Sequence, residues 1–456
     1  MLNISEHFEY YYQQNHLKVF QQLTDWDTYF TSDILEDQIC INGDLEKNCV
    51  SIQLGKQEGV YSCGISTSYY IGLDRLPRLG LSIYVAPKLN TDQYQVNYIE
   101  MLLEALKESE NFDHLDGLVV TKFEDDWIEI ENKMQPLLTP FLIAQFLSAV
   151  KDLLKRGLKK SYYQRQENLS GRIKGKILVG HQIRQNVFRN RLTSTVCQYQ
   201  EFGVDTEANR FIKHILSVIP RELDEFPAQH EIRKSLSDIW RYCQGGFQQV
   251  GKQSFSHLIY KENNPFYKNY NRVVQLGNQL LALRDYNIAR SVSAEKCLHP
   301  PFWIDMSKLF ELFVFKKLKE EFSGEGEVKY HQKFYGQEPD FIINTSTGLK
   351  AIVDAKYKPR YQNGNPSIAD ARQLAGYTRL NKIYEELGIN DSRVIPAYFV
   401  YPGNIVIAET EIKSENEEDF KEDSKLYSKR LLNGKFRNST MYKEMYLQEI
   451  DLPLVG

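Results

Sequence analysis

The pattern of apolar and polar residues divides the chain into three regions. Strand-like runs such as LSIYVAP (81–87), beside one helical stretch at 97–109, predict a mainly β N-terminal domain over residues 1–132. Between 133 and 295, apolar residues recur at three- and four-residue spacing, which predicts a helical middle domain. From 296 to 456 the predicted order is helix, hairpin, helix and strand. The predicted fold class is therefore multidomain α+β, with a C-terminal α/β domain.

Residues 338–358, EPDFIINTSTGLKAIVDAKYK, predict a β-hairpin with charges in an apolar strand. Asp340 opens the first strand, and Asp354 and Lys356 stand two apart in the second, so both point to one face. Carboxylates that hold Mg²⁺, with a lysine beside them, are what phosphodiester hydrolysis requires. The alternative is an exposed edge strand with a surface ion pair.

The hairpin resembles the PD-(D/E)xK nuclease superfamily, whose pattern is matched by Pro339, Asp340, Asp354 and Lys356. The resemblance implies that Asp340 and Asp354 bind Mg²⁺, with Mn²⁺ as a substitute. It also implies that the backbone carbonyl of Ala355 adds a ligand. Lys356 would orient the attacking water or neutralise charge in the transition state. The expected C-terminal domain is therefore a PD-(D/E)xK nuclease domain.

Two predicted helices flank this hairpin. The upstream helix, MSKLFELFVFKKLKEEF (306–322), carries Glu311 within an apolar stretch, and the resemblance implies a further catalytic acid there. The downstream helix (368–380) places Gln373 and Tyr377 on one face, a pair that recurs in some of these nucleases and that we expect to contact DNA. The alternatives are an acid at the edge of an apolar stripe and ordinary helix patterning.

A basic track occupies residues 153–191, which contain eleven Lys or Arg and one acid, Glu167. Such a track suits sequence-independent phosphate contacts, and we predict DNA binding by Arg172, Lys174 and Lys176. A solvated basic face is the alternative.

The same track contains a stretch, GRIKGKI (171–177), that only approximates a phosphate-binding loop. Three residues rather than four separate Gly171 from Gly175, and Ile177 stands where a Ser or Thr would reach Mg²⁺. We therefore expect that this chain binds no nucleotide itself.

The run AVKDLLKRGLKKSYYQRQENLSGRIKGKI (149–177), followed by VDTEANRFIKHIL (204–216), resembles the McrC family, nuclease subunits of modification-dependent McrBC restriction systems. With the nuclease hairpin, the resemblance covers roughly residues 80–410. It implies a subunit that hydrolyses no nucleotide, caps and stimulates a ring of a GTP-hydrolysing AAA+ partner, and cuts DNA. In that arrangement the N-terminal β domain is expected to dock on the partner.

The composition of the chain mainly excludes certain classes of protein. The net charge of −4, from 56 basic and 60 acidic residues, excludes a uniformly basic nucleic-acid binder. The six cysteines form no C-x-x-C pair, which favours free thiols in a reducing compartment. The sequence predicts no signal peptide, and its longest apolar run (136–150) is too short to span a bilayer. We expect a cytoplasmic protein without a membrane partner.

The leading hypothesis is a Mg²⁺-dependent DNA endonuclease subunit of a type IV, McrBC-like restriction system that takes part in antiviral defence. Two alternatives stay open. One is a non-catalytic adaptor of an AAA+ ring, and the other is a stand-alone DNA repair nuclease. Intact Asp340, Asp354 and Lys356 favour catalysis over the adaptor.

Overall fold

The computed structural model places most of the chain in two compact units. One unit combines residues 1–135 with residues 294–456, and the other comprises residues 136–293. The segments predicted as N-terminal and C-terminal domains thus share a unit, and the three-part division of the chain stays a prediction. The residues that the structure describes are 2–7, 9–13, 34–41, 44–57, 60–76, 81–91, 94–122, 127–131, 138–224, 230–290, 296–358, 366–403, 430–433 and 435–455.

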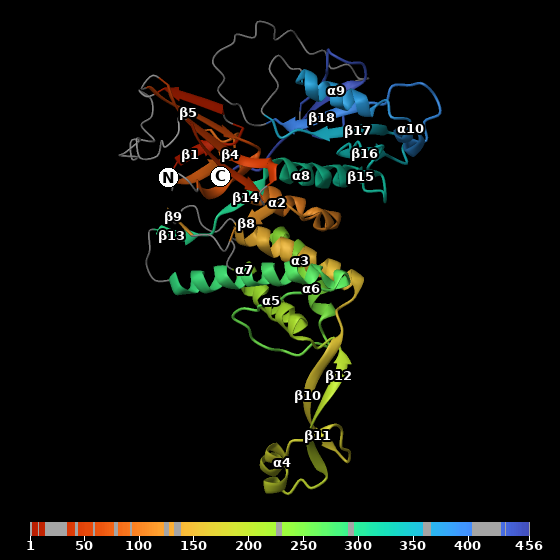
Figure 1. Ribbon diagram of the computed structural model, residues 1–456. Coiled ribbons are helices and arrows are strands. Elements are labelled where there is room, and N and C mark those ends of the chain that lie inside the picture. Colours follow the sequence, from red (N-terminus) through yellow and green to blue (C-terminus); the bar gives the residue numbers. More distant parts are fainter. Residues whose placement is uncertain are drawn as a thin grey trace. The chain divides into compact units, whose positions relative to one another are not determined.

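Strands dominate the N-terminal part of the first unit, as the apolar pattern predicts (Figure 1). They are β1 (Leu2–Ser5), β2 (Glu9–Gln13), β3 (Ile34–Ile41), β4 (Asp44–Gln57), β5 (Val60–Thr67), β6 (Tyr70–Leu76), β7 (Leu81–Ala86), β8 (Val119–Thr121) and β9 (Ile128–Glu131). The helical elements among them are α2 (Tyr98–Ala105) and the 3-10 helix η3 (Ser109–His114). Four of the strands form a sheet in the order β2-β5-β4-β3.

A second sheet combines strands from the N-terminal and C-terminal segments of this unit. Its order is β1-β7-β6-β14-β8, and β14 (Phe302–Asp305) comes from the C-terminal segment, as does β13 (Lys296–His299), which pairs with β9. Trp303 of β14 is fully buried, and its indole N–H donates to Asp74 at 2.7 Å. Lys122 forms an ion pair with the same carboxylate oxygen at 2.7 Å. The buried carboxylate of Asp74 therefore has both a donor and a counter-charge, which fixes β14 in this sheet.

A six-stranded mixed sheet forms the C-terminal part of this unit, in the order β15-β16-β17-β18-β20-β19. Its strands are β15 (Val328–Tyr330), β16 (Phe341–Asn344), β17 (Lys350–Ala355), β18 (Ala397–Pro402), β19 (Phe436–Asn438) and β20 (Met445–Ile450). The helices beside it are α8 (Met306–Glu321), α9 (Ile368–Tyr377) and α10 (Asn381–Leu387). The predicted hairpin is confirmed as β16 and β17, and the two predicted flanking helices are confirmed as α8 and α9.

Helices cover both faces of the six-stranded sheet. Ile352 of β17 packs in one cluster with Leu374 of α9. The next residue along β17, Val353, lies opposite Phe341 of β16, whose ring stacks on Phe315 of α8 with centroids 5.9 Å apart. Because neighbouring strand residues point to opposite faces, α8 and α9 lie on opposite sides of the sheet (Figure 1).

The described residues of the second unit form four long helices and a β-ribbon. The helices are α3 (Leu138–Arg156), α5 (Glu207–Asp224), α6 (His230–Gly246) and α7 (Asn269–Arg290). The smaller elements are β10 (Ser161–Ser170), β11 (Lys176–Ile177), α4 (Val179–Gln185), the 3-10 helix η5 (Val187–Arg189), β12 (Ser194–Gly203) and the 3-10 helix η6 (Pro265–Tyr267). The helical pattern of this region is confirmed for the long helices. It did not predict the ribbon.

We call residues 161–203 the basic ribbon, because most of the basic track lies on them. Strands β10 and β12 pair antiparallel over ten residues each, and β11 adds two residues to the other edge of β12. Gly175, just before β11, has a φ of +71°, and a Cβ there would lie 2.4 Å from the carbonyl oxygen of Gln198. Only glycine lets the chain approach β12 at this point.

Two further sequence-based expectations concern the charge-dense segment and the cysteines. The charge-dense segment 409–425, predicted to be a solvated loop or helix face, lies outside the described residues. Among the described cysteines, Cys49, Cys63, Cys197 and Cys243 are free and buried. No helix in the described parts of the chain is both long enough and apolar enough to cross a membrane.

Candidate functional site

The hairpin β16–β17 brings Asp340 next to the end of β17. Asp340 immediately precedes β16, and its carboxylate accepts a hydrogen bond from the backbone N–H of Ala355 at 2.7 Å. Lys356 follows the last residue of β17, and its backbone N–H donates to the carbonyl of Val400 in β18 at 2.8 Å. Hydrogen bonds to neighbouring backbone groups thus fix the Asp340 side chain and the Lys356 backbone.

Asp354 is buried, and its carboxylate has few polar contacts to offset the cost of its burial. Its exposed fraction is 1%, and neither of its oxygens accepts a well-aligned hydrogen bond from any described residue. The Nζ of Lys356 lies 2.9 Å from Oδ2, so the two side chains form an ion pair. A buried carboxylate whose charge is offset by one lysine alone is still costly to bury. Packing alone gives no reason for an aspartate here, which favours a functional role over a surface ion pair.

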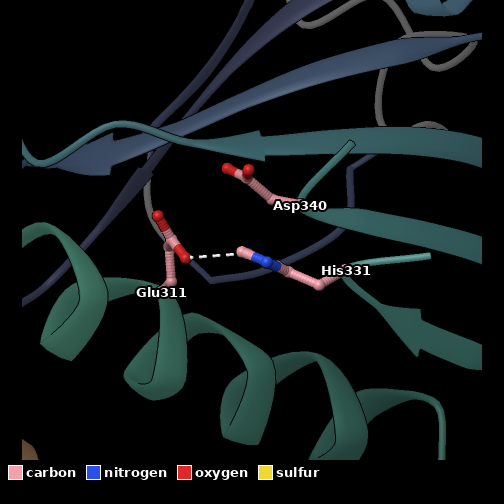
Figure 2. A group of neighbouring side chains, drawn as sticks. All are labelled: Glu311, His331 and Asp340. Carbon is pink, nitrogen blue, oxygen red and sulfur yellow. Dashed lines mark hydrogen bonds and ion pairs between the residues drawn. The ribbon is translucent and has the colours of Figure 1, made fainter. Parts of the chain in front are cut away.

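A second group of side chains converges on Asp340. One ligand atom each of Glu311, His331 and Asp340 can be chosen so that all three atoms lie within 4.8 Å of one another. Figure 2 shows Glu311 pointing up from α8 toward His331 and Asp340. The Nε2 of His331 lies 3.0 Å from Oε2 of Glu311, and the hydroxyl of Tyr330 donates to the same oxygen at 3.0 Å. Glu311 thus lies within contact distance of this group, and its role as a catalytic acid stays a prediction.

The carboxylates at the site repel one another. Burial, and then the charges of Asp354 and Glu311, raise the pKa of Asp340 well above its ordinary value. Burial also raises the pKa of Asp354 to about 6, against the opposing effect of Lys356. Closely placed carboxylates that resist ionisation are what a divalent cation would stabilise. The residues present therefore fit a hard metal ion.

The burial of Asp340, together with repulsion from its neighbours, has a testable consequence for stability in EDTA. A carboxyl whose pKa is raised on folding adds stability at low pH and loses it as the pH rises. The Asp340→Asn variant keeps an oxygen that accepts from Ala355 but carries no charge. Its Tm at pH 8 should exceed that of wild type by about 2–4 °C, roughly 1 kcal/mol for a domain of this size, and should match it near pH 4.

The matched control is Asp391→Asn. Arg393 lowers the pKa of this exposed carboxyl to about 2, so its removal should give no gain in Tm at pH 8. Thermal denaturation of wild type and both variants at the two pH values makes the comparison. A lower Tm for Asp340→Asn than for wild type at pH 8 would contradict repulsion among these carboxylates.

The predicted pair on α9, Gln373 and Tyr377, lies close to Lys356. The amide of Gln373 donates to the hydroxyl of Tyr377 at 2.9 Å, and its oxygen lies 3.5 Å from Nζ of Lys356. The Tyr377 hydroxyl in turn lies 3.4 Å from the carbonyl oxygen of Glu338. The helical face that holds Gln373 and Tyr377 thus borders the lysine. Their contact with DNA stays a prediction, as does the carbonyl of Ala355 as a ligand.

The structure places the predicted basic contacts in the other unit. Arg172, Lys174 and Lys176 are exposed on the basic ribbon. The Nζ of Lys174 lies 3.9 Å from the ring centroid of Tyr199. Several large apolar side chains are also exposed on this ribbon, namely Tyr162, Ile173, Ile177, Val179, Ile183, Val187, Phe188, Leu192 and Phe202. The ribbon therefore combines positive charge with apolar surface.

Sequence reasoning missed His331. The residue follows β15 and contacts Glu311, 20 residues earlier in the chain, and no local periodicity marks such a contact. The available signal was its place nine residues before Asp340, among only nine histidines in the chain.

Comparisons with known proteins agree with the resemblance found in the sequence. The family model for the McrBC 5-methylcytosine restriction system component matches residues 65–387. No curated protein matches the chain.

Two solved structures also show a likeness. One contains Thermococcus gammatolerans McrB AAA+ hexamers with bound McrC, at 15% identity and a TM-score of 0.36, covering 99% of this chain and 94% of that chain. The other is the Thermococcus gammatolerans McrBC complex, at 16% identity and a TM-score of 0.26, covering 72% of this chain and 89% of that chain. Neither TM-score is high enough to infer a shared fold.

The family match spans most of the chain and includes the hairpin with Asp340, Asp354 and Lys356. It confirms the resemblance to the McrC family that the sequence motifs indicated. The chain therefore belongs to the family of McrBC 5-methylcytosine restriction system components.

Proposed function

We propose that this chain is the DNA-cleaving subunit of a McrBC-type restriction system and hydrolyses phosphodiester bonds at a PD-(D/E)xK site on the β16–β17 hairpin. The observation that carries the proposal is the pairing of Asp354 with Lys356. The carboxylate is buried and faces the ammonium of Lys356 at 2.9 Å, and the lysine stays partly exposed, at 18% of its side chain. A charged pair that packing does not explain, on a strand end beside a further carboxylate, suits catalysis better than stability.

Each residue of the site has a distinct role in this proposal. Asp340 and Asp354 would hold Mg²⁺ or Mn²⁺, with the carbonyl of Ala355 as a further ligand and Glu311 as a third acid. When bound, the cation polarises the phosphoryl oxygen and activates water. Lys356 orients that water or offsets the negative charge that grows on the phosphate oxygens.

A GTP-hydrolysing AAA+ ring is the proposed partner. The family description places the chain in a multi-component restriction system. In one Thermococcus gammatolerans structure, McrC is bound to McrB AAA+ hexamers. We propose that this chain likewise caps and stimulates such a ring through its N-terminal β-sheets, and cuts DNA as part of that assembly.

The metal requirement tests the proposed chemistry directly. DNA cleavage should need Mg²⁺ or Mn²⁺ and should stop in EDTA. The metal should also raise the Tm of the folded chain, because it offsets repulsion among the carboxylates. At 100 times its dissociation constant, it should stabilise by about 2.7 kcal/mol. Cleavage that persists in EDTA would rule out the metal site.

The basic ribbon supplies the proposed sequence-independent DNA contacts. The triple variant Arg172→Ala, Lys174→Ala, Lys176→Ala should bind every DNA sequence less tightly. The slope of log affinity against log salt should fall by about 1 for each phosphate that the variant no longer neutralises, so by up to roughly 3. Fluorescence anisotropy over a salt series measures both effects.

The control removes three exposed lysines of the same unit that lie off the ribbon, Lys252, Lys261 and Lys268. It should leave the salt slope close to that of wild type. If the ribbon triple also leaves it unchanged, the ribbon does not bind DNA. Its exposed apolar residues, such as Ile173 and Phe188, would then favour contact with protein.

A further inference from the structure

We propose that His331 is a metal ligand beside Glu311 and Asp340, and that its imidazole makes the site prefer Mn²⁺ to Mg²⁺. This inference rests on the proposed nuclease function and adds to it a nitrogen ligand and a metal preference. The three side chains come from three places in the chain: helix α8, the residue after β15 and the residue before β16. Figure 2 shows them facing one another.

The ring nitrogens of His331 are arranged as in a metal-binding histidine. Nε2 faces the cluster, 3.0 Å from Oε2 of Glu311. Nδ1 lies on the other side, 3.2 Å from Oε1 of Glu338. Histidines that bind metals commonly direct the second ring nitrogen at a carboxylate, which fixes the tautomer and the ring orientation. Glu338 is therefore a positioning residue, and Lys333, 3.5 Å from its other oxygen, balances its charge.

The backbone of His331 supports a functional reason for its position. Its φ is +51°, in the left-handed region that residues other than glycine seldom adopt. Its N–H donates to the carbonyl of Asp340 at 3.0 Å, which ties the two proposed ligands together. The ring also packs on that of Tyr330, with centroids 4.1 Å apart. Strained residues held by several contacts are concentrated at functional sites.

Nitrogen in the ligand set changes which metal binds best. Mg²⁺ takes oxygen ligands almost exclusively, whereas imidazole is a good ligand for transition metals. Carboxylates together with one imidazole suit Mn²⁺, which accepts both oxygen and nitrogen ligands. Without His331, the remaining ligands are all oxygen, a set that also suits Mg²⁺.

The test is metal binding to the full-length chain without DNA. Electron paramagnetic resonance of free Mn²⁺ gives its affinity, and competition gives that of Mg²⁺. The main variant is His331→Asn, because asparagine tolerates a positive φ and offers an amide oxygen in place of nitrogen. The control is His257→Asn, at an exposed histidine of the other unit.

Wild type should bind Mn²⁺ more tightly than Mg²⁺. His331→Asn should weaken Mn²⁺ binding by about tenfold or more and change Mg²⁺ binding by less than about threefold, and Glu338→Gln should weaken Mn²⁺ binding by about tenfold. His257→Asn should bind as wild type does. Equal affinities of wild type and His331→Asn for Mn²⁺ would overturn the inference, even if the chain cleaves DNA. Tight, His331-dependent Mn²⁺ binding without any DNA cleavage would uphold the inference and refute the proposed function.

Discussion

Replacing Lys356 by Ala should lower DNA cleavage by about 10²–10³-fold, and replacing Asp354 by Ala should abolish it. Lys356 contacts the Asp354 carboxylate at 2.9 Å and stays partly exposed, where a phosphate can reach it. In the proposed mechanism, removing the lysine would take away a charge that stabilises the transition state, and removing the aspartate would take away a metal ligand. Gel assays on plasmid DNA, with the partner, GTP and Mg²⁺ or Mn²⁺ present, measure both losses.

Two controls separate catalysis from folding. Removing one partner of a buried ion pair leaves the other charge unpaired, which by itself destabilises a protein. The double variant Asp354→Asn, Lys356→Met removes both charges at similar volume, so it should keep the Tm of wild type and show no cleavage. Lys329→Ala removes a lysine of β15 that pairs with Glu386 of α10 and, within the described parts of the chain, forms no ion pair with the proposed site residues, and it should cleave as wild type does. Cleavage by the double variant would show that the pair is structural.

The second large effect is the separation of cleavage from stimulation. The chain alone should hydrolyse neither GTP nor ATP, yet it should raise the GTP turnover of its AAA+ partner. The Lys356→Ala variant should stimulate as well as wild type, because the hairpin is not the proposed docking surface. Phosphate release by the partner, with and without each variant, measures stimulation.

Changes on the N-terminal β-sheets should have the opposite effect. Lys47 and Gln53 are exposed on β4, and changing both to Glu should weaken stimulation without altering the nuclease site. Stimulation that falls in Lys356→Ala as much as cleavage does would contradict separate surfaces. Wild type that stimulates without cutting would indicate an adaptor, and cutting without partner or nucleotide would indicate a stand-alone nuclease.

The hairpin could be predicted from sequence because its signals are local. Alternating apolar residues, a Thr-Ser-Thr-Gly turn and charges at fixed spacing specify β16, β17 and the residues at their ends. The helices α8 and α9 were predictable for the same reason, since apolar periodicity within each segment marks them. The prediction of this helix also placed Gln373 and Tyr377 on one face. Their approach to Lys356, however, depends on the packing of α9 on the sheet.

The parts that sequence reasoning missed depend on distant partners or on exposure. Strand β14 is four residues long, and its Trp303 bonds with Asp74, 229 residues away. The basic ribbon is exposed on both faces over much of β10, so its strands lack the alternation that marks a half-buried strand. His331 enters the site through a left-handed backbone conformation, which composition does not reveal.

The most direct test of the central claim compares wild type with the Asp354→Asn, Lys356→Met double variant on 5-methylcytosine-containing DNA. Each protein is assayed with the AAA+ partner, GTP and Mn²⁺, and cleavage and GTP turnover are followed in the same tube. We expect wild type to cut the DNA and stimulate GTP hydrolysis, and the double variant to stimulate equally and cut nothing. Equal cleavage by the two proteins, or no cleavage by wild type despite full stimulation, would contradict the assignment of nuclease activity to this hairpin.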